Sequence, residues 1–583
     1  MAISSPSGPS AILRDATSGC WLRFDQPLET YETADPTAVP SLLRTVEAAV
    51  ASRGLYAVGW VAYEAAPAFD AALTVRPPAD AFPLLWFTLF KPPRPVAVTA
   101  SGTPAETEWR ASVAPDAYRA AFDRIKQHIR EGDAYQVDLT YRLHAAFHSD
   151  PLAAFSHLVA AQKAAYGAFL STPQWTLCSA SPELFFSLDG AHVASRPMKG
   201  TAPRGLTLEQ DRANAAALQT SEKDRAENVM IVDMVRNDLG RIAVPGSVSV
   251  PRLFTVEKYP TVWQMTSTVQ AETHASVAEI FAALFPAASI TGAPKSSAMR
   301  IIAENESSAR RVYTGAIGFI APHRRAQFNV AIRTLLIDNE AQRAEYGTGG
   351  GIVWDSECDS EQRECRTKAL ILTASGEPFS LLETLLWTPE DGVFLLREHL
   401  ARLAASAEYF DFAIDLASIH NRLERLADSL PPSPHRVRLL VACEGAVTCE
   451  TAPFAKPACT APLRVALASH PVDKNDPFLY HKTTRRRTYT EALASRPGFE
   501  DVILCNARGE VTESTRANVV VEIDGKRCTP PVRCGLLPGT LRQHLLDTHA
   551  LVERVITLDE LLHSPHVWLA NSLRGLTPVI VEK

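Results

Sequence analysis

Residues 221–240 of the chain are SEKDRAENVMIVDMVRNDLG, and residues 360–370 are SEQRECRTKAL. Both stretches mix charged residues with apolar residues at helical spacing. We predict one long or two shorter helices over 208–242 and a helix over 360–369. In each stretch two acids stand three residues apart, so they share one face of a helix. These pairs are Asp224 with Glu227, and Glu361 with Glu364.

The two acid pairs are candidate ligands for one cation. Ligation by oxygen atoms and waters alone suits Mg²⁺ rather than zinc. On spacing alone, acids on solvated helix faces that pair with neighbouring Lys and Arg are the commoner explanation.

Two segments of small residues favour a binding site instead. In SITGAPK (289–295) and GTGGGIV (347–353) the backbone can approach a ligand closely, and its N–H groups can hold a carboxylate. Arg333, in the segment AIRT, can bind a carboxylate through two hydrogen bonds. Taken singly, each glycine cluster is more often only a turn.

The composition is that of a globular protein. Of 583 residues, 46% are hydrophobic and 21% charged, and the net charge of −7 argues against a binder of nucleic acid or of an anionic membrane. The 10 cysteines include no CxxC pair, which argues against a structural zinc site or a disulfide framework and fits a reducing compartment. The N-terminus has no apolar signal core, and no run of about 18 residues is strongly apolar. We therefore expect a soluble cytoplasmic enzyme.

A domain boundary is predicted at TASGEP, residues 373–378, where a strand-like segment ends and a new apolar pattern begins. We divide the chain into a first domain of residues 1–375 and a second domain of residues 376–583. Each part is long enough to form its own hydrophobic core.

Eight segments of the first part resemble the motifs of a known enzyme family. They are SASPELFF (179–186), SRPMKGT (195–201), AENVMIVDMVRNDLG (226–240), SITGAPK (289–295), YTGAIGF (313–319), IRT (332–334), GTGGGIVWDSE (347–357) and ECRTKA (364–369). In this order they resemble the chorismate-utilising enzymes: anthranilate synthase large subunit, isochorismate and salicylate synthases, and aminodeoxychorismate synthase component I.

The resemblance implies a fold and a set of ligands. The expected fold is of the α+β or α/β class, with an anthranilate-synthase-like core of two sheets in a β-sandwich and helices outside it. The two acid pairs are then expected to bind Mg²⁺. Chorismate is expected to contact Thr291, Gly292, Arg333, Gly349 and Lys368.

Lys199 decides the subclass within this family. Anthranilate synthases carry alanine at the matching position, whereas lysine there is the mark of aminodeoxychorismate synthase and implies a covalent nucleophile. Chorismate must lose its ring hydroxyl and gain an amine at the same carbon. A neutral lysine that adds at the far end of the diene expels the hydroxyl, and ammonia then reverses the shift. Glu183 resembles the family's general acid, which protonates the departing hydroxyl.

Lys199 has a plainer interpretation, and three other positions differ from the pattern of the family. The plainer interpretation of Lys199 is a surface lysine beside a turn. Gln264 stands where anthranilate synthases usually carry histidine, so acid–base work by that histidine is not transferred to this chain. Ala287 and Ala288 stand where relatives often carry glycine.

Six segments of the second part resemble the motifs of a second enzyme family. They are LLETLLW (381–387), REHLARLAASAEYF (397–410), YHKTTRRRTY (480–489), GEVTESTRANVVV (509–521), GLLPGTLR (535–542) and NSLRGLTPV (571–579). They resemble the fold-type IV pyridoxal phosphate enzymes: branched-chain and D-amino acid aminotransferases and 4-amino-4-deoxychorismate lyase. An α/β domain is the fold this implies.

The resemblance implies pyridoxal 5′-phosphate as the cofactor, and the chemistry of this cofactor suggests a role for several residues in these motifs. Lys482 is expected to bond the cofactor and to move a proton, and Glu513 to face the ring nitrogen. The phosphate is expected to be held by an arginine and by a helix start with its hydroxyls, and a second arginine is expected to hold a substrate carboxylate. These residues are Arg402, Thr540 and Ser572 for the phosphate, and Arg574 for the substrate.

The two motif sets together imply consecutive reactions. These are amination of chorismate to 4-amino-4-deoxychorismate, then elimination of pyruvate to give p-aminobenzoate for folate-type or secondary metabolism. Two alternatives stay open: an anthranilate or isochorismate synthase fused to an aminotransferase, and a synthase whose second half is a non-catalytic docking module. No cysteine has the Gly-Cys-Gly setting of a glutamine amidotransferase, so ammonia is expected to be free or to come from a separate subunit. A homodimer also stays open, because fold-type IV enzymes often dimerise.

Overall fold

The computed structural model describes residues 8–78, 80–99, 107–373, 378–455 and 462–582. The chain divides into two compact units, Met1–Pro203 with Ala215–Glu377, and Arg204–Asn214 with Pro378–Lys583. The predicted boundary at residues 375 and 376 lies outside the described residues. Within the described part of the chain, no helix is long and apolar enough to cross a membrane.

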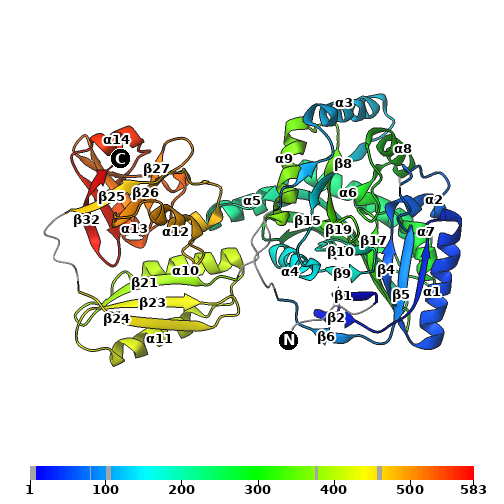
Figure 1. Ribbon diagram of the computed structural model, residues 1–583, viewed down its shortest axis with the longest axis horizontal. Coiled ribbons are helices and arrows are strands. Elements are labelled where there is room, and N and C mark those ends of the chain that lie inside the picture. Colours follow the sequence, from blue (N-terminus) through cyan, green and yellow to red (C-terminus); the bar gives the residue numbers. More distant parts are fainter. Residues whose placement is uncertain (1–7, 79, 100–106, 374–377, 456–461, 583) are drawn as a thin grey trace. The chain divides into compact units, whose positions relative to one another are not determined.

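Two antiparallel sheets form the centre of the first unit (Figure 1). In spatial order, the described strands of one sheet are β16 (Gly292–Ala293), β8 (Gln136–Ala146), β20 (Arg343–Ile352), β19 (Thr334–Asp338), β10 (Trp175–Ser179), β9 (Ala168–Ser171), β1 (Ser10–Asp15), β2 (Cys20–Phe24) and β6 (Arg94–Val96), with β7 (Arg110–Ala111) beside β8. Those of the other are β13 (Met198–Pro203), β15 (Val262–Glu272), β12 (His192–Arg196), β11 (Leu184–Asp189), β18 (Arg325–Val330), β17 (Ala316–Ala321), β4 (Tyr56–Val61), β5 (Leu85–Phe90) and β3 (Pro27–Thr33), with β14 (Ser249–Lys258) beside β15.

One hydrophobic core lies between the two sheets. It includes Leu13 and Leu177 from the first sheet and Trp60, Phe186 and Phe328 from the second. Phe186 and Phe328 pack with their ring centres 5.2 Å apart. Because both sheets bury side chains in the same cluster, the predicted two-sheet sandwich is confirmed.

Helices lie outside these sheets (Figure 1). They are α1 (Val39–Arg53), α2 (Ala66–Phe69), α3 (Pro115–Glu131), α4 (Pro151–Gln162), α6 (Glu222–Gly240), α7 (Val277–Leu284), α8 (Lys295–Asn305) and α9 (Cys358–Ala369), and α5 (Leu208–Thr220) precedes α6. The helical stretch predicted over 208–242 is thus two helices. Ser221 separates them, because its backbone is extended and its hydroxyl accepts a hydrogen bond from the Asp224 N–H.

The second unit contains a four-stranded and an eight-stranded sheet within the described residues. The strands of the smaller sheet are, in order, β22 (Gly392–Val393), β21 (Leu381–Thr388), β23 (His435–Val441) and β24 (Val447–Pro453). Those of the larger are β27 (Val511–Ser514), β26 (Asp501–Cys505), β25 (Leu463–Leu467), β32 (Gly575–Glu582), β31 (Val567–Asn571), β28 (Asn518–Ile523), β29 (Lys526–Thr529) and β30 (Val552–Glu553). The helices are α10 (Leu396–Phe410), α11 (Leu416–Ser429), α12 (Arg487–Ala494), α13 (Thr540–Asp547) and α14 (Leu558–His563). Since β27 also pairs with β28, part of the larger sheet closes on itself.

Candidate functional site

A cavity of about 360 Å³ lies in the first unit. Its walls come from β8, β13 and β20, from the loops before β11 and α8, and from α6 and α9. Sequence-predicted residues from six separate motifs meet in it. They are Glu183, Lys199, Asp224, Glu227, Arg333, Gly349, Glu361, Glu364 and Lys368.

Lys199 lies on β13 with its side chain largely buried. Its Nζ atom is 3.5 Å from Oδ1 of Asp138 on β8, and Gln136 Nε2 donates to the same oxygen at 3.0 Å. A Cβ atom at Gly351 would lie 2.7 Å from both Asp138 Oδ1 and Lys199 Nζ. The glycine segment on β20 therefore leaves room for this amine.

Glu183 is buried in the loop before β11. Ser289 Oγ donates a hydrogen bond to its carboxylate at 2.5 Å. Burial raises the pKa of Glu183 to about 7, although the Ser289 hydrogen bond and the charge of Lys199 both act to lower it. A carboxyl with this pKa can hold and give a proton near neutral pH.

The four acids of α6 and α9 line one wall of the cavity. Burial raises the pKa of Glu227, and the nearby Asp224 and Glu361 raise it further. Burial, followed by the charge of Glu364, likewise raises the pKa of Glu361. Lys368 Nζ lies 2.8 Å from Glu364 and lowers the pKa of that carboxyl.

These acids fit a bound Mg²⁺ by their chemistry. They are hard oxygen donors, and their mutual repulsion is the kind that a divalent cation relieves. Among the described residues, no three of the four bring carboxylate oxygens within 4.8 Å of one another. Mg²⁺ would therefore take only one or two of them in this arrangement, with the rest of its oxygen ligands from elsewhere.

Arg333 and Lys368 lie together on the wall of the cavity. Arg333 Nη1 donates to the Lys368 carbonyl and to Gln162 Oε1, both at 3.3 Å. Lys368 Nζ donates to the Gly349 carbonyl at 2.8 Å. Burial lowers the pKa of Lys368, but Glu364 outweighs it and holds that pKa above its ordinary value.

Two predicted substrate contacts lie off the cavity wall. The Thr291 hydroxyl lies 3.3 Å from the carbonyl oxygens of Ala287 and Ala288 and can donate to either. A Cβ atom at Gly292 would lie 2.1 Å from the Gln136 carbonyl, so this glycine allows β16 to pair closely with β8. The adjacent Ser289 and Ile290 line the cavity instead.

Gln264 lies on β15 beside β13, the strand that carries Lys199. Its Nε2 donates to the Gly200 carbonyl at 3.0 Å, and its Oε1 accepts from Thr201 Oγ1 at 3.1 Å. The side chain thus ties down the two residues that follow Lys199. Sequence reasoning missed Asp138, Ser289 and Lys223 on the cavity wall, although Ser289 stands inside a motif that it quoted.

The second unit holds a cluster of charged groups around Lys482. This lysine precedes α12, and its carbonyl accepts a hydrogen bond from Leu382 N at 2.9 Å. Burial lowers the pKa of its amine to about 8, with Arg402 and Arg486 acting in the same direction. Glu383 and Glu513 oppose them. A lysine with this pKa is partly neutral near neutral pH.

Glu513 is buried on β27. Its carboxylate accepts hydrogen bonds from Tyr489 Oη at 2.7 Å and from Leu537 N at 3.1 Å. Burial raises the pKa of Glu513 to about 7, against the hydrogen bond from Tyr489. The two hydrogen bonds hold the carboxyl in place.

Arg402, a predicted phosphate ligand, is bonded to an acid that the sequence did not single out. Its Nε and Nη2 donate to Glu383 at 2.9 and 2.6 Å, and Nη1 donates to the Pro538 carbonyl at 3.2 Å. His399 Nδ1 lies 2.7 Å from Glu383, and its Nε2 lies 3.3 Å from Thr540 Oγ1 at the start of α13. Burial alone would raise the pKa of Glu383, but Arg402 and His399 hold it at about 2.

Two further predicted residues lie in the turn between β31 and β32. Ser572 is buried there, and Arg574 N donates to Asn571 Oδ1 at 2.8 Å. A lysine with a lowered pKa, a buried carboxyl and an arginine beside a helix start are the groups that pyridoxal phosphate requires. The residues present therefore fit this cofactor. Lys482 would bond it, Glu513 would face its ring nitrogen, and Arg402 with Thr540 and Ser572 would hold its phosphate.

Two family models match successive parts of the chain. Residues 94–374 match the family model described as chorismate binding enzyme, and residues 380–580 match the model described as amino-transferase class IV. Aminodeoxychorismate synthase component 1 from Escherichia coli (strain K12) is 41% identical over 262 residues, which are 44% of this chain and 57% of that protein. An anthranilate synthase component 1 from Haloarcula marismortui is 39% identical over 254 residues, 43% of this chain and 50% of that protein.

A solved structure shows the fold of the first unit. Anthranilate synthase component I from Streptococcus pneumoniae aligns with 64% of this chain and 94% of its own, at 24% identity and a TM-score of 0.51. The chain spans about half the length of the curated relatives described above.

Proposed function

We propose that this chain, which joins a chorismate-binding-enzyme domain to an amino-transferase class IV domain, converts chorismate to p-aminobenzoate in two steps. One observation carries the first step: Lys199 and Glu183, an amine and a carboxyl that can hold a proton, meet in a single cavity. Overall identity does not separate the subclasses, since the aminodeoxychorismate and anthranilate synthases are 41% and 39% identical to this chain. The lysine favours the former.

The first step is the amination of chorismate. Lys199, once it has lost its proton, adds to the ring while Glu183 gives a proton to the departing hydroxyl, which leaves as water. Ammonia then adds at the carbon that lost the hydroxyl and releases Lys199. The sum is chorismate and ammonia to 4-amino-4-deoxychorismate and water.

Other residues of the cavity hold the substrate during this step. Arg333 and Lys368 offer positive charge to its carboxylates. Mg²⁺, when bound by acids of α6 and α9, supplies charge neutralisation at a substrate carboxylate. Ammonia is proposed to be free or to come from a separate glutamine amidotransferase subunit. Co-purification and glutamine-dependent turnover test that partner, and the idea fails if glutamine never replaces ammonium.

The second step is the release of pyruvate. Pyridoxal phosphate, when bound, supplies an electron sink for the carbon that carries the amine. Lys482, with its pKa near 8, takes the proton from that carbon, and Glu513 stays hydrogen-bonded to Tyr489 and Leu537 in the same cluster. Loss of the enolpyruvyl group as pyruvate makes the ring aromatic, which drives the step and leaves p-aminobenzoate.

The pH dependence of the amination step tests the proposal. Because Glu183 must be protonated to act as the acid, we expect its ionisation to impose a decline on the turnover number as pH rises through about 7, on top of the gain that loss of the Lys199 proton gives. The rate of aminodeoxychorismate formation is measured at saturating chorismate and a constant concentration of un-ionised ammonia. Glu183→Gln should remove both this decline and most of the activity.

Ser289→Ala is the matched variant for this experiment. Its hydroxyl lowers the pKa of Glu183, so its loss should move the decline to higher pH. A decline that stays in place in Ser289→Ala, or that persists in the residual activity of Glu183→Gln, would assign it to another group and remove Glu183 from the mechanism.

A further inference from the structure

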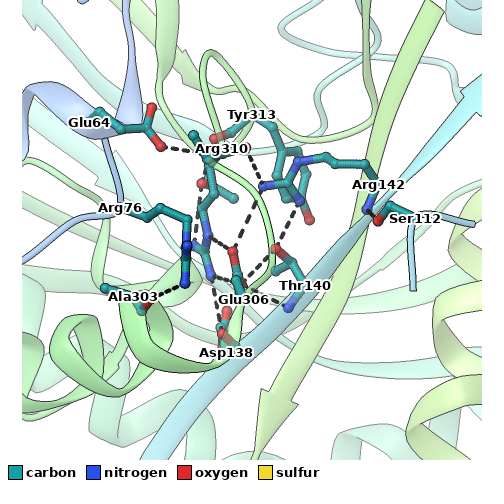
Figure 2. A network of polar contacts seen from close by, with 12 residues as sticks. Glu64, Arg76, Ser112, Asp138, Thr140, Arg142, Ala303, Glu306, Arg310 and Tyr313 are labelled. Carbon is teal, nitrogen blue, oxygen red and sulfur yellow. Dashed lines mark hydrogen bonds and ion pairs between the residues drawn. The ribbon is translucent and has the colours of Figure 1, made fainter. Parts of the chain in front are cut away.

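Glu306 and Arg310 form a buried ion pair in the first unit, drawn in Figure 2. Neither residue lines the cavity. Glu306 is the C-cap residue of α8, and Arg310 lies in the segment that follows the helix. Arg310 Nε and Nη2 donate to the Glu306 carboxylate at 3.0 and 2.6 Å. Both side chains are almost fully excluded from solvent.

Several other hydrogen bonds of this pair reach residues that do line the cavity. Arg310 Nη2 donates to the Asp138 carbonyl at 3.1 Å, and Nη1 donates to the Ile290 carbonyl at 2.9 Å. Glu306 Oε1 accepts from the N–H and the hydroxyl of Thr140 at 2.9 and 2.7 Å. Asp138, Thr140 and Ile290 all belong to the cavity wall.

A second arginine, Arg142, joins the network through Thr140 (Figure 2). Arg142 Nη1 donates to Thr140 Oγ1 at 3.0 Å, and its guanidinium lies 4.8 Å from the centre of the Tyr313 ring, which also lines the cavity. The network thus connects the wall residues of β8 with those of the loops on either side of α8.

Two of these wall positions support the proposed catalytic groups. Asp138 places its carboxylate 3.5 Å from Lys199 Nζ. Ile290 follows Ser289, whose hydroxyl bonds Glu183. One guanidinium is therefore bonded to the backbone that carries both contacts.

We propose that Arg310 is a positioning residue that fixes Lys199 and Glu183 relative to each other through the backbone of residues 138 and 290. The inference rests on the function proposed above and assigns to that site a residue outside the cavity. Arginine suits the task, because its planar guanidinium presents five N–H donors in a fixed geometry, whereas lysine is a point charge on a flexible stem.

Stability alone is a weak reason for such a pair. Taking two charges out of water costs about as much as their attraction returns, and apolar replacements of buried pairs are often neutral. Geometry is a better reason, because a displacement of about 1 Å in a reacting group can cost about a hundredfold in rate.

Arg310→Lys tests the proposal in the full chain. It keeps the charge opposite Glu306 but cannot reach both carbonyl oxygens. We expect the turnover number for amination to fall about a hundredfold while the KM for chorismate changes by less than about threefold. Arg325→Lys is the matched control: it weakens the contact of Arg325 with Asp15 in the same unit, and neither residue lines the cavity. Its kinetics should stay close to those of the unchanged chain.

Glu306→Gln guards against simple misfolding. It keeps an oxygen for Thr140 and nearly the same shape, and we expect a smaller loss of turnover in the same direction with KM unchanged. Thermal unfolding of all variants is recorded beside the kinetics. The proposal is overturned if Arg310→Lys keeps its turnover number, or if its loss is no larger than that of Arg325→Lys at equal folded fraction.

A readout without substrate separates this inference from the proposed reaction. The carboxyl stretch of protonated Glu183, assigned with Glu183→Gln, is followed by infrared spectroscopy as a function of pH. If Arg310 holds the 289–290 backbone, Arg310→Lys should move the titration midpoint upward as Ser289 moves away, and Arg325→Lys should not. A shifted midpoint in a chain that does not aminate chorismate would sustain the positioning role and reject the reaction. An unshifted midpoint would reject the positioning role.

Discussion

Lys199→Ala is expected to lower the rate of aminodeoxychorismate formation from chorismate and ammonia by at least about a thousandfold. The amine is the proposed nucleophile, and removing a nucleophile eliminates the whole covalent route rather than weakening one contact. The product is measured by chromatography with chorismate, ammonium and Mg²⁺ all saturating. Supplied aminodeoxychorismate should still be converted to p-aminobenzoate, since the second unit is unchanged.

Lys223→Ala is the matched control, because Lys223 is another lysine on the wall of the same cavity. It removes a positive charge without removing the proposed nucleophile, and we expect at most about a tenfold loss. Equal losses in the two variants would mean that Lys199 contributes only charge. Near-normal turnover in Lys199→Ala would exclude the covalent role.

Lys482→Ala is expected to abolish p-aminobenzoate formation and to let aminodeoxychorismate accumulate. The residue is the proposed attachment point for the cofactor and the group that moves the proton, so its loss should cost at least about a thousandfold in the second step. Borohydride reduction followed by mass spectrometry should label Lys482 in the unchanged chain and leave the variant unlabelled.

Lys526→Ala serves as the control for this second variant, because Lys526 is an exposed lysine on β29 of the same unit. It should keep both the label and the rate. If p-aminobenzoate still forms in Lys482→Ala at a normal rate, then the cofactor is not bonded at this position and the lyase proposal fails. If neither the unchanged chain nor the control takes up a label, the result would favour the alternative in which the second unit is a non-catalytic docking module.

Local pattern was enough to predict the helices that carry the acids. The helix predicted over 360–369 is α9 (Cys358–Ala369), because charged and apolar residues alternate there at helical spacing. The stop between α5 and α6 also had a local signal. Ser221 stands three residues before Asp224, and its side chain caps the second helix.

Contacts between distant segments were beyond the reach of sequence pattern. Asp138 meets Lys199 only because β8 and β13 both border the same cavity. Nothing in the sequence near either residue indicates that the other is its partner. Glu383 is one position in an apolar strand motif, and its hydrogen bonds to Arg402 and His399 depend on how α10 packs on β21. Such pairings need the register of whole strands, which periodicity does not supply.

The division of the chain into two units was also only partly predictable from sequence pattern. Composition and pattern place the break near residue 376, yet Arg204–Asn214 is grouped with the second unit. A segment inside one motif-rich region gives no compositional sign that its contacts lie with another part of the chain. The placement of Thr291 and Gly292 off the cavity wall follows the same rule, since a motif names a segment but not which of its residues face inward.

The central claim is that one chain carries chorismate through to p-aminobenzoate. The most direct test incubates the purified chain, loaded with pyridoxal phosphate, with chorismate, ammonium and Mg²⁺ and without any α-keto acid. The account predicts p-aminobenzoate and pyruvate in equal amounts, with no requirement for an amino-group acceptor. Anthranilate in place of p-aminobenzoate, or turnover of the second unit only when a keto acid is added, would contradict it.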